Sequence, residues 1–168
     1  MPGKIILTII FRVRLMQFVL SCDLEKAFHH ILLNIMDRDI TRMMWPNDPL
    51  VEDEPKIYRI TWVPFGMGPS PFLLGETVEY HLEQSDSQWA QKLIRASYVD
   101  NYLVSVAEPQ QIGSAIKEIR DLFWKAGFNC RQFLSNAREE VYKLPMEWLE
   151  TKTQVSCLES NGTQLLMN

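Results

Sequence analysis

The apolar residues of the chain fall into short runs that are separated by polar or proline-containing segments. Residues 17–22 read as a short buried strand that delivers Asp23 at its end, and residues 57–63 alternate well enough to form another strand. Residues 97–106 hold two runs rich in Tyr and Val around an Asp-Asn pair. This arrangement predicts a β-hairpin with the Asp-Asn pair at its turn.

The clearest helix is predicted over residues 109–126, because apolar residues recur there at helical spacing. These residues are Ile112, Ala115, Ile116, Ile119, Leu122, Phe123 and Ala126. Gly127 ends this helix, and a strand is predicted over residues 128–134. Another helix is predicted behind the loop of residues 64–71, with Ser70 as its cap and a proline in its first turn.

The order of these elements is strand, a mixed segment, strand, helix, hairpin, helix, strand. It predicts an α+β fold in which two main helices pack on one face of an antiparallel or mixed sheet. Asp23 and Asp100 both stand at strand ends in this scheme. A split βαβ arrangement, as in ferredoxin-like folds, can place such ends side by side.

A length of 168 residues is enough for one domain with a hydrophobic core. The formal net charge of −4 argues against a free-standing nucleic-acid binder, because affinity for phosphate backbones comes largely from Lys and Arg. The three cysteines have no metal-type spacing and an odd count. They suggest neither a zinc site nor a disulfide framework.

The N-terminal segment of residues 4–15 is apolar, and its pattern slightly favours a helix over a strand. Its apolar run, residues 5–11, is far too short to span a bilayer. Arg12 and Arg14 follow where a signal peptide would have small residues. We therefore expect no signal peptide, no membrane partner, and an intracellular, cytoplasmic location.

Two carboxylates that converge from neighbouring strands would form a hard, anionic oxygen site suited to Mg²⁺. Paired metal ions in such a site stabilise the attacking and leaving oxygens of a phosphoryl transfer. Plainer interpretations stay open at this point. The pair Asp100 and Asn101 could be only an Asx turn, and residues 64–71 could be an ordinary connection between strand and helix.

Three stretches stand in order along the chain: DLEKAF at residues 23–28, VPFGMGPSP at residues 63–71 and YVDN at residues 98–101. Together they resemble motifs A, B and C of a reverse transcriptase palm. Details in and between them, with SN at residues 135–136, resemble the Bel/Pao class of LTR retrotransposons. The resemblance covers residues 5–136 and implies the fold of a polymerase palm.

The resemblance also implies roles for individual residues. Asp23 and Asp100 would bind two Mg²⁺ ions with help from the backbone carbonyl of Leu24, and Asn101 occupies the third catalytic position of the family. The implied contacts with nucleotide and primer are Phe28 as the sugar gate, Phe65 and Gly66 in the nucleotide pocket, Tyr98 and Val99 against primer and nucleotide, and Arg131 near the leaving pyrophosphate.

Two departures from the family pattern bear on activity. The third acid of the family is replaced by Asn101, which is neutral and a weaker Mg²⁺ ligand. Only 22 residues precede Asp23, too few for the basic fingers, and nothing after Ser135 resembles the thumb or RNase H regions, which we expect neighbouring DNA to encode. We therefore expect weak activity or none from this chain by itself.

The sequence thus predicts a reverse transcriptase palm with partial fingers over residues 1–136 and an irregular tail over residues 137–168. The expected activity is that of an RNA-directed DNA polymerase, which transfers a nucleotide from a dNTP to a primer 3′-OH. The expected partners are an RNA or DNA template-primer and the dNTP, with Mg²⁺ as cofactor. A catalytically dead remnant, a module that binds nucleic acid or protein, and an unrelated ferredoxin-like domain remain alternatives.

Overall fold

The structure, a computed structural model, describes residues 17–46 and 54–149, together with Thr8, Phe11, Arg14 and Leu15. Its strands are β1 (Phe18–Leu24), β2 (Arg42–Trp45), β3 (Lys56–Arg59), β4 (Ser97–Tyr98), β5 (Asn101–Val106) and β6 (Cys130–Ser135). Its α-helices are α2 (Ser70–Glu83), α3 (Gln88–Ala96), α4 (Ile112–Lys125) and α5 (Arg138–Val141). Short 3₁₀ helices are η1 (Ala27–His30), η2 (Ile35–Thr41), η3 (Pro109–Gln111) and η4 (Met146–Trp148).

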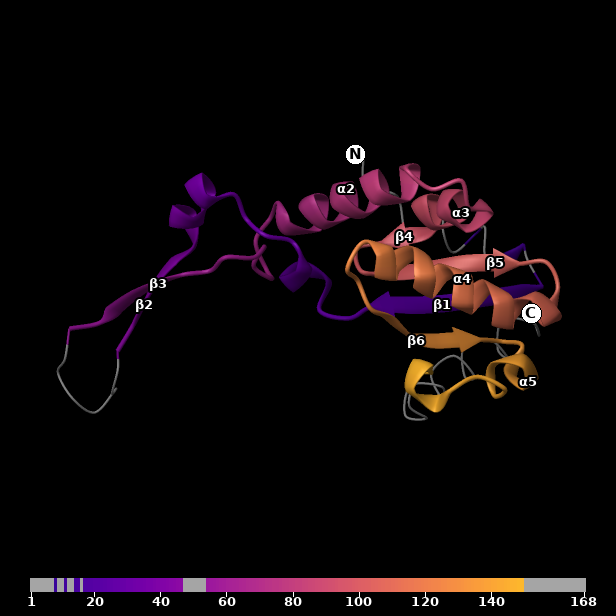
Figure 1. The fold of residues 1–168 in the computed structure, drawn as a ribbon. Coiled ribbons are helices and arrows are strands. Elements are labelled where there is room, and N and C mark those ends of the chain that lie inside the picture. Colours follow the sequence, from indigo (N-terminus) through magenta and orange to yellow (C-terminus); the bar gives the residue numbers. More distant parts are fainter. Residues whose placement is uncertain (1–7, 9–10, 12–13, 16, 47–53, 150–168) are drawn as a thin grey trace.

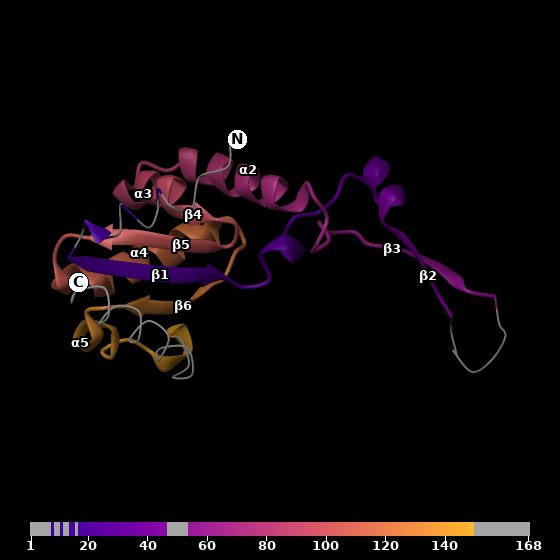
Figure 2. The same ribbon diagram turned by 180° about the vertical axis from the view of Figure 1, so that it is seen from behind.

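The central sheet has the strand order β4-β5-β1-β6, and every neighbouring pair is antiparallel. Helix α4 lies in front of this sheet in Figure 1 and behind β1 and β5 in the opposite view of Figure 2. The helices therefore cover one face of the sheet. The predicted α+β class, with an antiparallel sheet and helices packed on one face, is confirmed.

The core lies between the sheet and its helices. On β1 the buried residues Leu20, Cys22 and Leu24 alternate with half-buried ones, as expected when one face of a strand is covered. The predicted apolar stripe of α4 is buried from Ile112 to Phe123, and the Phe123 ring packs on that of Tyr102, with ring centroids 4.9 Å apart. The pattern read from the sequence therefore identifies the packing face of α4.

Helix α3 is an element that the sequence pattern did not predict, and it adds to the two main helices expected. Trp89, Ala90 and Leu93 bury its apolar face. Its first turn is capped by Ser87, whose Oγ accepts a hydrogen bond from the backbone N–H of Trp89 at 3.1 Å. Nine residues are too few for periodicity to distinguish a helix from a loop.

Helix α2 begins at Ser70, with Pro71 in the first turn as predicted. The prediction that Ser70 caps this helix is wrong, because Pro69 is the cap residue. The hydroxyl of Ser70 is buried and donates to the carbonyl oxygen of Pro64 at 2.6 Å. Ser70 thus closes the loop in front of the helix instead of capping its N-terminus.

The strand predicted over residues 57–63 is divided in the structure. Strand β3 pairs with β2 in a hairpin that extends away from the body of the protein (Figure 1), and every residue of both strands is exposed. Farther along, Trp62 forms an isolated bridge with Leu32. Residues 47–53, which join β2 and β3, lie outside the described residues.

The predicted helix over residues 109–126 is seen as η3 followed by α4, and it ends before Gly127, which has φ +80°. The predicted strand over residues 128–134 is β6. The predicted tail contains α5 and η4, and residues 150–168 lie outside the described part, as does most of the N-terminal apolar segment. Among the described residues, no helix has the length and apolar character needed to cross a membrane.

Candidate active site

Asp23 lies near the end of β1, on the sheet face that helices α2, α3 and α4 leave open in the described part of the chain. The neighbours Cys22 and Leu24 are buried beneath the helices, so the alternation of a strand directs Asp23 to the other face. Across the β1–β5 ladder, Asp23 is paired directly with Asn101. Residues paired in this way share a face of the sheet, which places Asn101 beside Asp23.

The hairpin between β4 and β5 carries Asp100 in its turn. Tyr98 pairs with Asn101, so the two loop residues are Val99 and Asp100. The predicted turn at Asp100 and Asn101 is therefore displaced by one residue, and Asn101 belongs to β5. Val99 takes the left-handed conformation, with φ +57°, which is uncommon for a β-branched residue. Such strain costs about 1–3 kcal/mol and persists only where the surrounding structure enforces it.

A backbone hydrogen bond joins this turn to the end of β1. The N–H of Leu24 donates to the carbonyl oxygen of Asp100 at 3.0 Å. Because Asp23 precedes Leu24 and Asn101 follows Asp100, the structure brings the two acids to the same end of neighbouring strands. This is the arrangement that the strand order predicted for Asp23 and Asp100.

Asn101 is engaged with its neighbour in the turn. Its side-chain Nδ2 donates to Oδ1 of Asp100 at 3.0 Å. One oxygen of the Asp100 carboxylate thus already accepts a hydrogen bond. The amide of Asn101 presents an N–H where a carboxylate would present a further negative oxygen.

Glu25 lies in the same region, although no role is predicted for it from the sequence. Its Oε1 forms an ion pair with Nη1 of Arg131 at 3.0 Å, and its Oε2 accepts a hydrogen bond from Nδ2 of Asn129 at 2.7 Å. The hydrogen bond from Asn129 is the main cause that lowers the pKa of Glu25, and the charge of Arg131 adds to it against partial desolvation. Both oxygens of the Glu25 carboxylate thus already have partners, so Glu25 does not replace the third acid of the family pattern.

Arg131 lies on the other side of Asp23. Strands β1 and β6 pair Asp23 with Arg131, so Asp23 is flanked by Asn101 on β5 and Arg131 on β6. Two-fifths of the Arg131 side chain is exposed, at 40%. The three residues come from distant parts of the sequence and meet only because the strands assemble in this order.

Phe28 and Phe65 are also brought together. Phe28 is buried in η1, and its ring meets that of exposed Phe65 edge to face, with ring centroids 5.2 Å apart. Gly66 follows with φ +88° and open space around its Cα. Tyr98 is about half exposed, at 48%, beside the turn. The aromatic pair and the glycine therefore form one surface at the loop before α2.

A family model described as reverse transcriptase (RNA-dependent DNA polymerase) matches residues 3–132. The chain belongs to the reverse transcriptase family. A search of curated proteins finds no match. The family resemblance drawn from residues 23–28, 63–71 and 98–101 is thereby confirmed at the level of the reverse transcriptase domain.

The two acids of this reverse transcriptase domain have the type of side chain that binds divalent metal ions in proteins. Among the described residues, no group of three or more His, Cys, Asp and Glu could hold a metal. The pair Asp23 and Asp100, with the nearby carbonyl of Leu24, nevertheless provides the hard oxygen donors that Mg²⁺ prefers. Mg²⁺ retains several waters and also binds substrate phosphates, so two carboxylates fit its chemistry.

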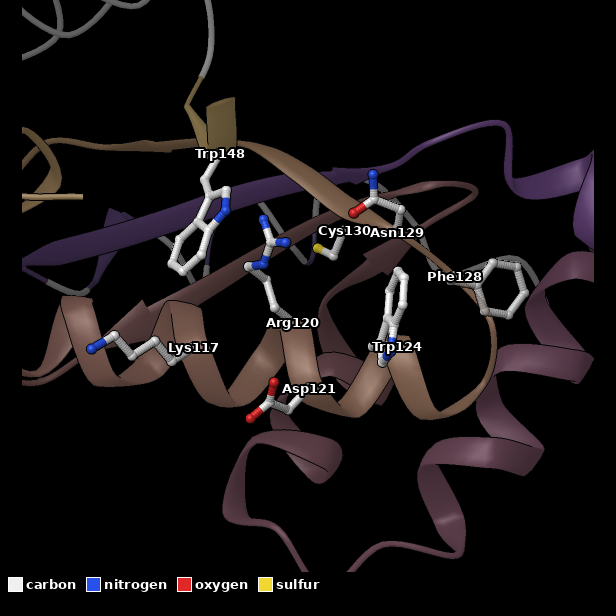
Figure 3. A pocket seen from close by; sticks show the side chains of 8 residues that line it. All are labelled: Lys117, Arg120, Asp121, Trp124, Phe128, Asn129, Cys130 and Trp148. Atoms are coloured by element: carbon white, nitrogen blue, oxygen red, sulfur yellow. The ribbon is translucent and has the colours of Figure 1, made fainter. Parts of the chain in front are cut away.

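A surface pocket opens on the helix side of the domain, between α4 and η4 (Figure 3). Its volume is about 450 Å³, and Arg120, Trp124, Asn129 and Trp148 are among the residues that line it. The guanidinium of Arg120 lies over the Trp148 ring, 4.1 Å from its centroid, and thereby holds η4 against α4. Sequence periodicity gave no sign of this pocket, because Trp148 joins it only through the fold.

Proposed function

We propose that this reverse transcriptase domain performs nucleotidyl transfer at Asp23 and Asp100, adding a nucleotide from a dNTP to a primer 3′-OH on an RNA template. The observation that supports the proposal is that the two acids stand at the same end of neighbouring strands. Asp23 is paired with Asn101, and the Leu24 N–H is bonded to the Asp100 carbonyl, so the backbones of both acids lie at one end of the β1–β5 pair. Convergent carboxylates on an accessible surface suit two-metal phosphoryl transfer.

Asp23, Asp100 and the Leu24 carbonyl would hold Mg²⁺, which when bound stabilises the charge of the transferring phosphoryl group. Phe28 would lie against the sugar and exclude a ribose 2′-hydroxyl. Its burial and its contact with Phe65 support this role, because a gate needs a fixed ring. Phe65 and Gly66 would line the nucleotide pocket, and their exposure leaves them accessible to a ligand.

Tyr98 and Val99 would contact the primer end and the nucleotide from the turn that carries Asp100. The strained backbone of Val99 supports this role, because strain persists at sites where position matters more than stability. Arg131 would assist the leaving pyrophosphate. We also assign the domain to a Bel/Pao-type retrotransposon, on the motif details given above.

Asn101 argues for low activity. Its amide occupies an oxygen of Asp100 and adds no negative charge to the site. The same observation favours a second candidate function, a catalytically dead remnant or a module that retains nucleic-acid or protein binding. In that case the fold persists while the metal chemistry is lost.

Primer extension separates the two candidates. The full chain is incubated with an RNA template, a DNA primer, dNTPs and Mg²⁺, and Asp100→Ala is the matched control. Extension by the unmodified chain and not by Asp100→Ala is the expected result. Equal signal from both proteins would reject catalysis at this site, and retained template-primer binding by both would then support the binding module.

A further inference from the structure

The register between β1 and β6 changes just before Asp23. Ser21 pairs with Leu134, whereas Asp23 pairs with Arg131, so β6 contributes one extra residue between these pairs. Gln132 lies in this bulge and takes a left-handed conformation, with φ +56°. Bulges of this kind redirect side chains and are common next to active sites.

The bulge decides which face of the sheet receives Arg131. An unbroken register from Ser21 would place Gln132 opposite Asp23 and Arg131 opposite Leu24. Leu24 is buried beneath the helices, so Arg131 would then face the core. The bulge instead places Arg131 beside Asp23 on the open face, at the cost of a strained residue.

Glu25 and Asn129 then hold Arg131 in that position. The Glu25 carboxylate receives the Arg131 guanidinium on one oxygen and the Asn129 amide on the other, at 3.0 and 2.7 Å. The Glu25 backbone N–H also donates to the Asn129 carbonyl at 2.9 Å. A carboxylate fixed at both oxygens and at its backbone cannot rotate away, so it restricts the guanidinium that it binds.

The Arg131 guanidinium has further capacity for a ligand. Its Nε is buried and has no hydrogen-bond partner among the residues that the structure describes, whereas 40% of the whole side chain is exposed and accessible to a ligand. Guanidinium groups bind phosphate oxygens through several N–H donors. Arg131 is paired with Asp23 across the β1–β6 ladder, on the face from which a nucleotide would reach Asp23.

We infer that Glu25 is a positioning residue: with Asn129 and the Gln132 bulge, it fixes Arg131 beside Asp23, where Arg131 binds the phosphates of the nucleotide. The inference rests on the proposed function, because it assigns this anion to the nucleotide substrate or its pyrophosphate product. Glu25 acts through Arg131 and touches no substrate. An effect of Glu25 substitution on phosphate binding should therefore depend on the presence of Arg131.

The sign of one measurement distinguishes positioning from simple charge. Inorganic pyrophosphate is titrated into the full chain in excess Mg²⁺, by calorimetry. Because Glu25 is an anion, its removal would strengthen pyrophosphate binding if it acted only by repulsion. If it positions Arg131, Glu25→Ala weakens binding by about threefold or more, as Arg131→Ala does, and it has no further effect in the Arg131→Ala background.

The controls address folding and geometry. Glu25→Gln keeps an oxygen for the Arg131 guanidinium and is expected to retain part of the affinity, while Glu140→Ala removes a carboxylate that pairs with Lys143 and is expected to change nothing. Thermal unfolding of each variant identifies any that fails to fold, in which case Glu25→Gln against Glu140→Ala is the comparison. Unchanged or tighter pyrophosphate binding by Glu25→Ala overturns the inference, as does a failure of the unmodified chain to bind pyrophosphate.

Primer extension supplies a separate readout. The Glu25→Ala substitution is expected to raise the KM for dNTP more than it lowers kcat, because the lost interaction is with bound phosphate. If the unmodified chain extends no primer but pyrophosphate binding follows the expected pattern, polymerase activity fails and the positioning of Arg131 stands. If extension occurs and Glu25→Ala leaves the KM unchanged, only the positioning role is rejected.

Discussion

Asn101 donates its side-chain N–H to Oδ1 of Asp100, 3.0 Å away, and so occupies one oxygen of the carboxylate that the proposed chemistry needs. The two residues are adjacent in the sequence, yet they have different places in the structure. Asp100 is in the turn, and Asn101 begins β5 opposite Asp23. The site therefore has two acids, whereas the family pattern has three, and the amide of Asn101 stands in the place of the third.

The substitution Asn101→Asp is expected to increase Mg²⁺-dependent primer extension by about tenfold or more, because a charged ligand adds electrostatic stabilisation at the transferring group. It places a third carboxylate beside Asp23 and Asp100. Without Mg²⁺ the repulsion among these groups should lower the melting temperature, and added Mg²⁺ should restore it.

Extension rate and melting temperature are measured with and without Mg²⁺. The double substitution Asp100→Ala with Asn101→Asp is the control, and it should remain inactive. A melting temperature of Asn101→Asp that does not respond to Mg²⁺ would show that the acids do not form a common cation site.

Replacement of Phe123 by Ala is expected to destabilise the fold by about 3–5 kcal/mol, the cost of removing a fully buried aromatic ring. Phe123 has no exposed surface and packs on Tyr102. Urea unfolding monitored by circular dichroism measures the change. Trp124→Ala is the matched control, since this neighbour on α4 is 70% exposed and its loss should cost much less. Equal costs would contradict the packing described for α4.

The substitution Gly127→Ala is expected to cost about 1 kcal/mol, because an L side chain is strained in the left-handed conformation that ends α4. Gly127 has φ +80°, and an added Cβ would meet no atom within 4 Å, so the cost is one of backbone conformation alone. Gly75 also has open space, but it lies within α2, where Ala is expected to stabilise by about 0.5–1 kcal/mol. Opposite shifts of the urea midpoint are therefore expected. Shifts of the same sign would contradict the different backbone conformations described for Gly127 and Gly75.

Alkaline pH should destabilise the protein through the buried groups of the core. Burial raises the pKa of the Cys130 thiol, and burial likewise raises the pKa of the Tyr102 hydroxyl. The unfolded chain therefore releases protons that the folded protein retains, so stability is full below the ordinary thiol pKa of 9.0 and falls as pH rises above it.

Urea midpoints between about pH 8 and pH 10.5 measure this slope, which follows from the difference in protons bound by the two states. Cys130→Ser with Tyr102→Phe should flatten it. The same burial predicts that iodoacetamide alkylates Cys130 slowly in the native state and rapidly in urea, because the thiolate is the reactive form. Fast native alkylation of Cys130 would contradict its buried position.

The parts of the fold that the sequence predicts are those with local signals. Helix α4 has a regular apolar stripe and a terminating glycine, and β1 has a buried run that ends near Asp23. In helix α3 the buried residues Trp89, Ala90 and Leu93 are also at helical spacing, but nine residues are too few for that spacing to identify a helix. The hairpin turn is displaced because Val99 takes a conformation that its residue type disfavours, and only the surrounding contacts enforce it.

The residues of the candidate site likewise fall into those with a local sequence signal and those without one. Asp23, Asp100 and Phe28 each belong to a short continuous motif, so they can be identified as candidate site residues from the sequence. Glu25 and Asn129 are 104 positions apart, and their hydrogen bond exists only after β1 and β6 pair. No reading of local pattern could join them, and the bulge that turns Arg131 to the open face is likewise a property of two strands together.

The hairpin of β2 and β3 is expected to be less stable than the central sheet. All eight of its strand residues are exposed, and Thr41 secures its base through hydrogen bonds to the carbonyl oxygens of Arg38 and Ile60. An isolated two-stranded ladder is only marginally stable in water. Its amide protons should therefore exchange with deuterium long before those of β1 and β5, and protease cleavage should begin in this arm while the palm remains intact.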